Sequence, residues 1–126
     1  MIAVIAAVAA CNSNTNSSSN SDSSAGTSAS GANDVTSNPD YQKGLSLIAS
    51  NDCLTCHKVD EKVTGPAYRD VANKYENTDA NVKMLAQKVI TGGSGNWGAV
   101  AMTPHPALSE TDAEQMVKYI LLLRNK

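Results

Sequence analysis

The sequence predicts an all-α protein with one compact domain. Four stretches repeat apolar residues at the spacing of an amphipathic helix, and no stretch alternates apolar and polar residues for long enough to predict a strand. Residues suited to helix caps stand at the expected ends of these stretches. The chain has 126 residues and few large apolar side chains in its first third, so we place the single domain at residues 38–126.

Two helices are predicted in the first half of this domain. The first begins with Asn38, an N-cap candidate, and has Pro39 at its first helical position. The second opens at Gly65-Pro66, where proline again suits a helix start. The apolar positions at helical spacing are Tyr41, Gly44, Leu45 and Ile48 in the first helix and Tyr68, Val71, Ala72 and Tyr75 in the second.

Two more helices are predicted in the second half. Either Thr78 or Asp79 caps the third helix, and Gly92 ends it. Ser109 caps the last helix. Between the two, residues 92–108 show no helical pattern and are expected to form a long loop. The apolar positions of these helices are Val82, Leu85, Ala86, Val89 and Ile90, then Ala113, Met116, Tyr119, Ile120 and Leu123.

The start of the chain resembles a bacterial lipoprotein leader. Residues 1–10 are almost all Ala, Val and Ile, which fits a signal peptide and is too short to span a bilayer. The positive charge usual at such a start is absent, so we expect this leader to be truncated. Val8-Ala9-Ala10-Cys11 is similar to a lipoprotein box, which implies that Cys11 carries the lipid. The alternative is an ordinary Ala-rich leader with an incidental cysteine.

Residues 11–37 are expected to form a flexible linker behind the lipid anchor. Ser, Asn, Gly and Ala dominate this stretch, and no large apolar residue precedes Val35, so it cannot bury enough surface to offset its chain entropy. Such a linker would tether the domain to a membrane, with a reach that grows as about the square root of its length. The alternative is a terminal segment with no mechanical role.

Composition and charge narrow the class of partner. The chain is 41% hydrophobic and 4% aromatic with no phenylalanine, so a large apolar cofactor inside the fold would enlarge an otherwise small core. The formal net charge is −2 and there is no run of Lys or Arg, so nucleic acid is not an expected partner. From residue 38 onward acidic and basic residues are equal in number, so any steering field must come from their uneven distribution.

The segment Cys53-Leu54-Thr55-Cys56-His57 carries the chemistry. Its C-x-x-C-H spacing is typical of c-type haem attachment, in which two thiols add to the porphyrin vinyl groups and the adjacent histidine ligates iron. A short turn of backbone would place both sulfurs along one edge of the macrocycle, with the imidazole next to the metal. The sequence therefore predicts one covalent haem c held by Cys53, Cys56 and His57.

The same spacing admits three other interpretations. A thioredoxin-like redox pair expects a preceding strand and a βαβ context, and the sequence predicts no strand. A structural zinc site needs four ligands, and the only further candidates are His105 and Cys11. A local disulfide between the two cysteines is not dismissed by spacing alone.

The sixth ligand of the iron decides whether a haem transfers electrons or binds ligands. Met84 and Met116 fall within helices, where the helical period explains each as a core side chain. Met102 lies in the proline-containing loop outside any helical stripe, and it is the favoured sixth ligand. His105 is the rival, although proline on both sides limits its approach.

From residue 38 to residue 126 the chain resembles the small bacterial class I cytochromes c. The resemblance implies the class I cytochrome c fold, about four helices packed around one covalent haem. It also implies a close crossing of the first and last helices at Gly44 and Tyr119. The residues that carry the resemblance are Gly44, the attachment motif, Gly65-Pro66 after it, the Trp97-containing loop that leads to Met102, and Tyr119 in the last helix.

The same resemblance implies roles for two further residues. The carbonyl of Pro66 would accept a hydrogen bond from the His57 imidazole, which fixes the ring and raises its basicity. The indole N–H of Trp97 would donate to a haem propionate, although a core tryptophan seeking any acceptor is an equal alternative.

These inferences predict a mono-haem electron carrier and not an enzyme, because a His/Met iron has no vacant position in either oxidation state. We expect a monomer on the periplasmic side of a bacterial membrane, with a donor such as a quinol-oxidising complex and an acceptor such as a terminal oxidase or reductase. Contact would be brief, near Cys53 and Cys56. Lys58 and Lys62 flank this edge, either to steer an acidic partner or simply as solvated surface charges. The alternatives are a peroxidase or reductase haem module with an open or bis-His iron, and a haem-free thiol redox protein.

Overall fold

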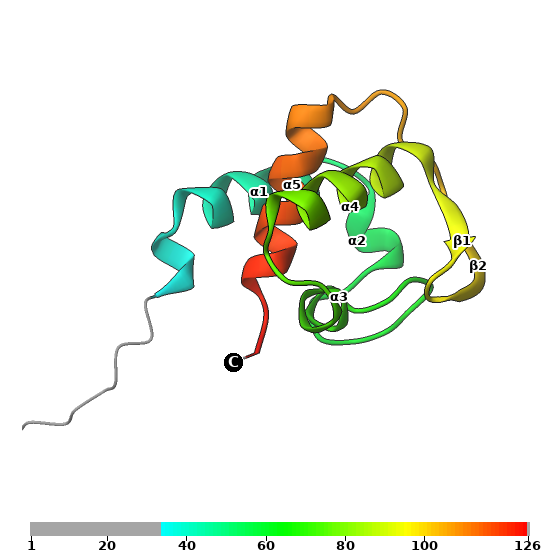
Figure 1. Ribbon diagram of the computed structural model, residues 1–126, viewed down its shortest axis with the longest axis horizontal. Helices are drawn as coiled ribbons and strands as arrows, with labels where there is room; N and C mark the ends of the chain where they lie inside the picture. The colour runs from blue at the N-terminus through cyan, green and yellow to red at the C-terminus, as the bar shows by residue number, and fades with distance from the viewer. Residues whose placement is uncertain (1–33, 126) are drawn as a thin grey trace, which may run out of the picture. The chain divides into compact units, whose positions relative to one another are not determined.

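The computed structural model describes residues 34–125, and this part of the chain is mostly helical (Figure 1). The predicted leader at residues 1–10, Cys11 and most of the predicted linker lie outside the described residues. The elements, in chain order, are η1 (Val35–Ser37), α1 (Pro39–Ala49), α2 (Cys53–Cys56), α3 (Tyr68–Lys74), α4 (Asp79–Thr91), β1 (Gly93–Gly95), β2 (Gly98–Met102) and α5 (Glu110–Leu122).

The predicted helix starts are confirmed for α1, α4 and α5, because a polar side chain caps each one. The Asn38 side chain accepts a hydrogen bond from the Asp40 N–H at 2.8 Å. Thr78, and not Asp79, caps α4 by accepting from the Asn81 N–H at 3.3 Å. The Ser109 hydroxyl accepts from the backbone N–H three residues later, at 3.1 Å, at the start of α5. Each cap satisfies a donor that the first helical turn leaves without a partner.

The second predicted helix begins later than expected, at Tyr68 and not at Gly65-Pro66. The N–H of Gly65 instead donates to the Cys56 carbonyl at 2.8 Å, and the Pro66 carbonyl accepts from His57. These bonds hold the Gly65-Pro66 pair in a turn against the attachment segment. Proline therefore marks the approach to this helix and not its first residue.

The expected loop at residues 92–108 contains a small antiparallel hairpin, which corrects the prediction that the chain has no strands. Strands β1 and β2 pair Gly93 with Met102 and Gly95 with Gly98. Three of these four positions are glycine and the hairpin is exposed, so no alternation of apolar and polar side chains was available to reveal it. Backbone hydrogen bonds alone define these strands.

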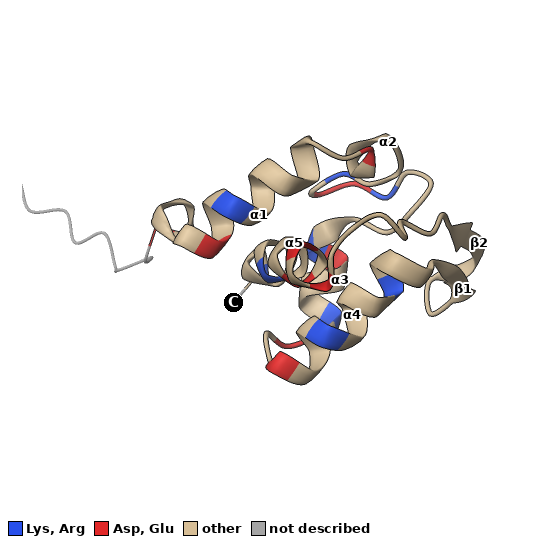
Figure 2. Ribbon diagram, turned by 90° about the horizontal axis from the view of Figure 1, so that it is seen from above, with Lys and Arg blue, Asp and Glu red and all other residues tan. Residues whose placement is uncertain are grey.

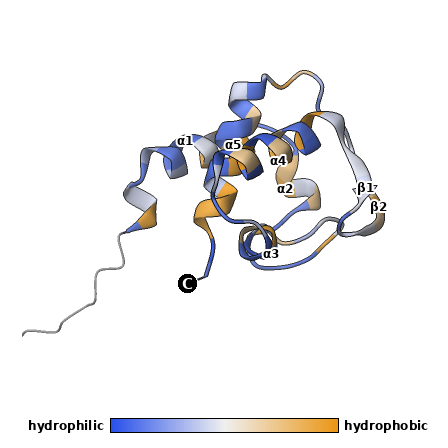
Figure 3. Ribbon diagram, in the orientation of Figure 1, coloured by the Kyte–Doolittle hydropathy of each residue, from blue (hydrophilic) through white to orange (hydrophobic). Residues whose placement is uncertain are grey.

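Helix α5 is central, because α1, α3 and α4 all pack against it (Figure 1). Hydrophobic residues are concentrated along its second half (Figure 3). One core cluster lies between α5, α1 and α3, and a second lies between α5 and α4. Their buried members are Ile48, Tyr68, Ala72, Met116, Tyr119, Ile120 and Leu123 in the first cluster and Val82, Ala86, Ala113, Val117 and Leu121 in the second.

Met84 is not a core side chain, contrary to the expectation from helical period. It is 45% exposed, whereas Met116 is buried as predicted. The buried face of α4 contains Val82 and Ala86, four residues apart. Because a residue two positions along a helix points to the opposite side, Met84 faces solvent.

The first and last helices cross in close contact at Gly44. A Cβ atom on Gly44 would lie 2.6 Å from the Gln115 carbonyl oxygen, and the Tyr119 Cβ would be nearer still. Next to this crossing, the Gln115 side-chain amide donates to the Asp40 carboxylate at 2.9 Å. The rings of Tyr41 and Tyr119 meet edge to face at 4.9 Å. Only glycine allows the two helices to approach this closely.

Acidic and basic residues are interspersed along the described helices (Figure 2). Neither sign forms a continuous run in the sequence of these helices. Within residues 34–125, none of the helices has both the length and the apolar character needed to cross a bilayer.

Candidate functional site

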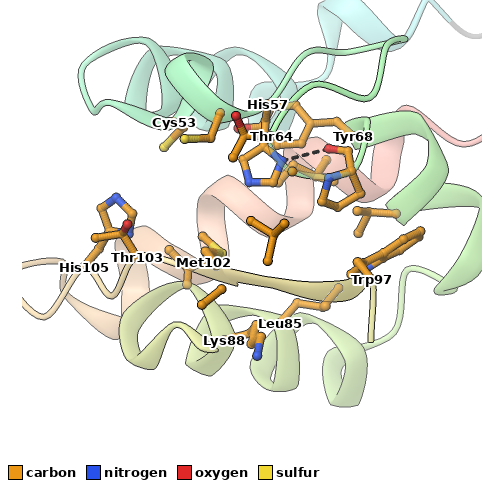
Figure 4. Close-up of a pocket in the computed structure, with 18 of the residues that line it drawn as sticks. Cys53, His57, Thr64, Tyr68, Leu85, Lys88, Trp97, Met102, Thr103 and His105 are labelled. Atoms are coloured by element: carbon orange, nitrogen blue, oxygen red, sulfur yellow. Dashed lines mark hydrogen bonds between the residues drawn. The ribbon is translucent and has the colours of Figure 1, made fainter. Parts of the chain in front are cut away.

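A cavity of about 460 Å³ lies between the attachment segment, α3, α4, the hairpin and α5. His57 lies on one wall, and Met102 lies on the wall across from it (Figure 4). The sequence-predicted residues Cys53, Cys56, His57, Pro66, Trp97, Met102 and His105 all line this cavity. Much of the remaining wall is apolar and comes from Ile48, Val71, Leu85, Val89, Met116 and Ile120.

The two cysteines of the attachment motif lie on one turn of helix. Helix α2 runs from Cys53 to Cys56, and the N–H of His57 donates to the Cys53 carbonyl at 3.0 Å. Because residues three apart lie on the same side of a helix, both thiols line the cavity. Cys53 is half-buried and Cys56 is exposed, and the structure joins neither of them in a disulfide. The turn therefore presents two separate thiols along one edge of the cavity.

The imidazole of His57 is fixed on three sides. Its Nδ1 donates to the Pro66 carbonyl at 2.8 Å (Figure 4). Its ring stacks on the ring of Tyr68, with centroids 5.2 Å apart and planes inclined by 18°. A Cβ on Gly65 would lie 2.8 Å from Nδ1 and 2.9 Å from Nε2, so glycine is required there. Because a carbonyl only accepts, Nδ1 carries the hydrogen, and Nε2 keeps a lone pair for a metal ion.

The position of Tyr68 follows from how α3 begins. The first N–H groups of this helix donate to the attachment segment, from Tyr68 to the Lys58 carbonyl and from Arg69 to the Val59 carbonyl, both at 2.9 Å. These bonds satisfy donors that have no partner inside the helix. They also bring the buried Tyr68 ring against His57, a contact that no local sequence pattern indicated.

The environment of Cys53 weighs against a reactive thiol pair. Burial raises the pKa of the Cys53 thiol above its ordinary value. Burial also raises the pKa of the Tyr68 hydroxyl, and the nearby Cys53 adds to this shift. Reactive redox cysteines depend on a lowered pKa and a thiolate at neutral pH. Cys53 is thus a neutral thiol, and a thioredoxin-like role does not fit it.

Met102 ends strand β2 on the wall opposite His57 (Figure 4). His105, its rival as a ligand, also lines the cavity, and its Nδ1 is buried without a hydrogen-bond partner in the described part of the chain. The backbone N–H of His105 donates to the Val89 and Ile90 carbonyls of α4, at 3.2 and 3.1 Å. Both candidates are therefore near the cavity, and Met102 is the one that faces His57.

Trp97 lies at the turn of the hairpin and contributes to the cavity wall. Trp97 is 37% exposed, and the Nζ of Lys74 lies 4.5 Å from the centroid of its ring. The same Nζ donates to the Asn96 carbonyl at 3.2 Å. Lys74 therefore steadies the hairpin turn through a cation–π contact and one hydrogen bond.

The family model for cytochrome c matches residues 41–124, which is more than half of the chain. This chain belongs to the cytochrome c family. Cytochrome c-552 of Nitrosomonas europaea is 40% identical to it over 83 residues, which cover 66% of this chain and 81% of that protein. Cytochrome c-551 of Allochromatium vinosum is 39% identical over 87 residues, covering 69% of this chain and 93% of that protein.

Solved structures agree with the sequence match. The crystal structure of wild-type cytochrome c552 from Nitrosomonas europaea has a TM-score of 0.59 and covers 63% of this chain and 98% of that chain. The class 1 cytochrome MtoD from Sideroxydans lithotrophicus has a TM-score of 0.54 at 27% identity and covers 65% of this chain. The cytochrome thus has the class I fold that its sequence predicted.

As a member of this family, the cytochrome binds one covalent haem c and carries electrons, and it is not an enzyme. The cavity fits this group on its own evidence. It offers two free thiols one helical turn apart, an imidazole whose Nε2 is free, and largely apolar walls. Among the described residues, no three His, Cys, Asp or Glu side chains gather as a separate metal site. The family match favours a haem protein over the thiol redox and zinc alternatives.

Proposed function

We propose that this cytochrome c passes single electrons between redox proteins on the periplasmic side of a bacterial membrane, with His57 and Met102 as the axial ligands of its iron. In this proposal Cys53 and Cys56 form the two thioether bonds. The observation that carries it is the pairing across the cavity, since a fixed imidazole with a free Nε2 faces a thioether on the opposite wall.

Each residue of the site has a physical task in this proposal. The haem supplies an iron that changes between the ferrous and ferric states. The Pro66 carbonyl holds the His57 proton on Nδ1 and keeps the imidazole basic. The thioether of Met102 would hold the iron from the opposite wall and favour its ferrous state. Trp97 would donate its indole N–H to a propionate.

The apolar wall supports the same role. Ile48 and Met116 are buried to 1% exposure and line the cavity. These side chains would keep water away from a bound haem iron, and the resulting low dielectric would favour the less charged ferrous form. Little rearrangement accompanies electron transfer when the ligands and their surroundings stay in place.

Partner contact is proposed at the edge that carries the thiols. Cys56 is exposed there, and the neighbouring Leu54 is 39% exposed. A small, brief interface at such an edge suits a donor such as a quinol-oxidising complex and an acceptor such as a terminal oxidase or reductase. Lys58 and Lys62, both in this part of the chain, are candidates to steer an acidic partner toward the edge.

The proposed location rests on the sequence alone. Residues 1–10 would act as a signal peptide of lipoprotein type, Cys11 would carry the lipid, and residues 11–37 would be the linker to the domain. Mass spectrometry of protein matured in a haem-attaching bacterial host would show both a haem adduct and an acylated Cys11. An unmodified N-terminal peptide would contradict the lipid tether and leave the haem assignment intact.

The axial pair is tested with matched substitutions at its two candidates. Met102→Ala should abolish the weak charge-transfer absorption of a methionine-bound ferric iron and lower the reduction potential. His105→Ala should keep that absorption, as should Met84→Ala at the solvent-exposed methionine. A wild-type ferric protein that lacks this absorption, with a spectrum that changes in His105→Ala and stays the same in Met102→Ala, would assign the ligand to His105.

A further inference from the structure

Gly92 follows directly on α4 as its C-cap, and its backbone has φ +67°, a conformation that residues with a side chain rarely adopt. Its N–H donates to the Lys88 carbonyl at 2.8 Å. A Cβ at this position would lie 2.8 Å from the Pro104 nitrogen, and the Met102 carbonyl oxygen would be nearer still. The backbone from Met102 to Pro104 therefore lies directly on the end of this helix, in the space that a side chain would need.

Two more contacts hold the same segment. The N–H of His105 donates to the Val89 and Ile90 carbonyls, at 3.2 and 3.1 Å. These are carbonyls of the last helical turn, which lack partners within a helix. Gly93 pairs with Met102 in the hairpin. The end of α4 thus contacts the chain at Met102 and again three residues later.

We propose that Gly92 is a positioning residue for Met102. Because Gly92 has no side chain, residues 102–105 lie against the end of α4, and this contact directs the Met102 thioether across the cavity toward His57. This inference rests on the proposed axial role of Met102. In this inference the strength of the bond between Met102 and the iron depends on Gly92, although this glycine would contact neither the iron nor the thioether sulfur.

Gly98 provides a matched control, since it separates backbone strain from steric contact. Its φ is +114°, so a side chain there is strained as well, yet a Cβ would meet nothing within 4 Å. Both glycines lie between the end of α4 and the end of β2. Gly98→Ala therefore measures only the effect of a side chain at a positive φ. Gly92→Ala has this effect and, in addition, pushes the backbone of residues 102–105 away from the end of α4.

The experiment uses the matured holoprotein and imidazole as a probe of the sixth position. Ferric Gly92→Ala should lose most of the methionine-to-iron absorption and bind imidazole about tenfold more tightly or better, the effect of a modest overpacking penalty. Gly98→Ala should keep the absorption and bind imidazole within about twofold of wild type. Equal behaviour of the two variants would overturn the proposal.

A measurement on the unmodified protein covers the case in which Gly92→Ala does not accumulate. Imidazole that displaces Met102 should increase amide hydrogen exchange at His105, whose N–H bonds to the end of α4, by about tenfold or more. Exchange at Val117, in the centre of α5, should stay unchanged. An unchanged rate at His105 would show that the segment and the helix end are not coupled.

The Met102→Ala variant distinguishes an error in the axial role of Met102 from an error in the positioning role of Gly92. If this variant keeps the absorption, the axial assignment itself is wrong. If it loses the absorption while Gly92→Ala retains it, the axial assignment stands and the role of Gly92 is wrong.

Discussion

Gly44 and Tyr119 touch at the crossing of α1 and α5, with no room for even a methyl group on the glycine. The contact joins the first helix of the domain to its last. It lies beside the larger of the two core clusters, which contains Tyr119. The two helices can therefore approach this closely only because residue 44 is a glycine.

Replacing Gly44 by alanine should destabilise the protein by about 1–3 kcal/mol, because the new methyl group would press against the Gln115 carbonyl and the Tyr119 Cβ. Helix propensity alone predicts the opposite sign, a gain of about 1 kcal/mol. Denaturant unfolding followed by far-ultraviolet circular dichroism measures the difference. Ser46→Ala, at an exposed position of the same helix, is the control and should change stability by less than about 0.5 kcal/mol.

Replacing Gly65 by alanine should push the His57 ring away from Pro66, since a Cβ would lie 2.8 Å from Nδ1. Loss of the hydrogen bond to Pro66 makes the imidazole a weaker donor and disfavours ferric iron. The reduction potential should rise by about 40 mV, the one-electron equivalent of a hydrogen bond worth about 1 kcal/mol. Redox titration measures this, and Val63→Ala, at an exposed side chain of the same loop, should leave the potential unchanged. A fall in potential would contradict the prediction.

Replacing Arg69 by alanine should destabilise the protein by about 1–2 kcal/mol, because one guanidinium holds the end of the chain. Its Nη1 donates to the Leu123 carbonyl at 2.7 Å and to the Asn125 side chain at 3.0 Å. Its Nε pairs with Asp60, which is largely exposed. Asp60→Asn removes only this ion pair and should cost less than about 1 kcal/mol. Equal losses in the two variants, measured by thermal unfolding, would show that the bonds to the C-terminal end contribute nothing.

Stability should fall in alkali partly because of Tyr119. Burial raises the pKa of this phenol above its ordinary value of 10.0, with the nearby Tyr41 as the next cause. The neutral phenol is favoured in the folded state, so its contribution is fully present below the unfolded-state pKa and is lost as pH rises toward the folded-state value. Between about pH 9 and pH 11, Tyr119→Phe should lose less stability than wild type. If the unfolding free energies of Tyr119→Phe and wild type fall equally over this pH range, the prediction is wrong.

The helix ends and the attachment motif were predictable because each depends on residues close together in the chain. Asn38, Thr78 and Ser109 cap helices through contacts with backbone two or three residues away. The two thiols and the adjacent imidazole of the motif lie on five consecutive residues, and one helical turn brings the thiols to the same cavity wall. Local spacing was enough for all of these features.

Other features depend on contacts between distant elements and gave no local signal. The hairpin of β1 and β2 is made largely of glycine backbone, which carries no pattern of apolar side chains. Helical period alone does not show which face of α4 packs against α5. Met84 was therefore predicted to be a core side chain, whereas it is exposed. The contact of Gly92 with the Met102 segment appears only when both parts are folded.

The hydrogen bond between Gln115 and Asp40 joins residues 75 positions apart. Because α1 packs on α5, the native environment of α1 cannot form until α5 has been synthesised. The two cysteines lie between these helices, so they remain accessible on an open chain during that interval. An attachment enzyme can then reach both thiols before the last helix docks and closes the domain.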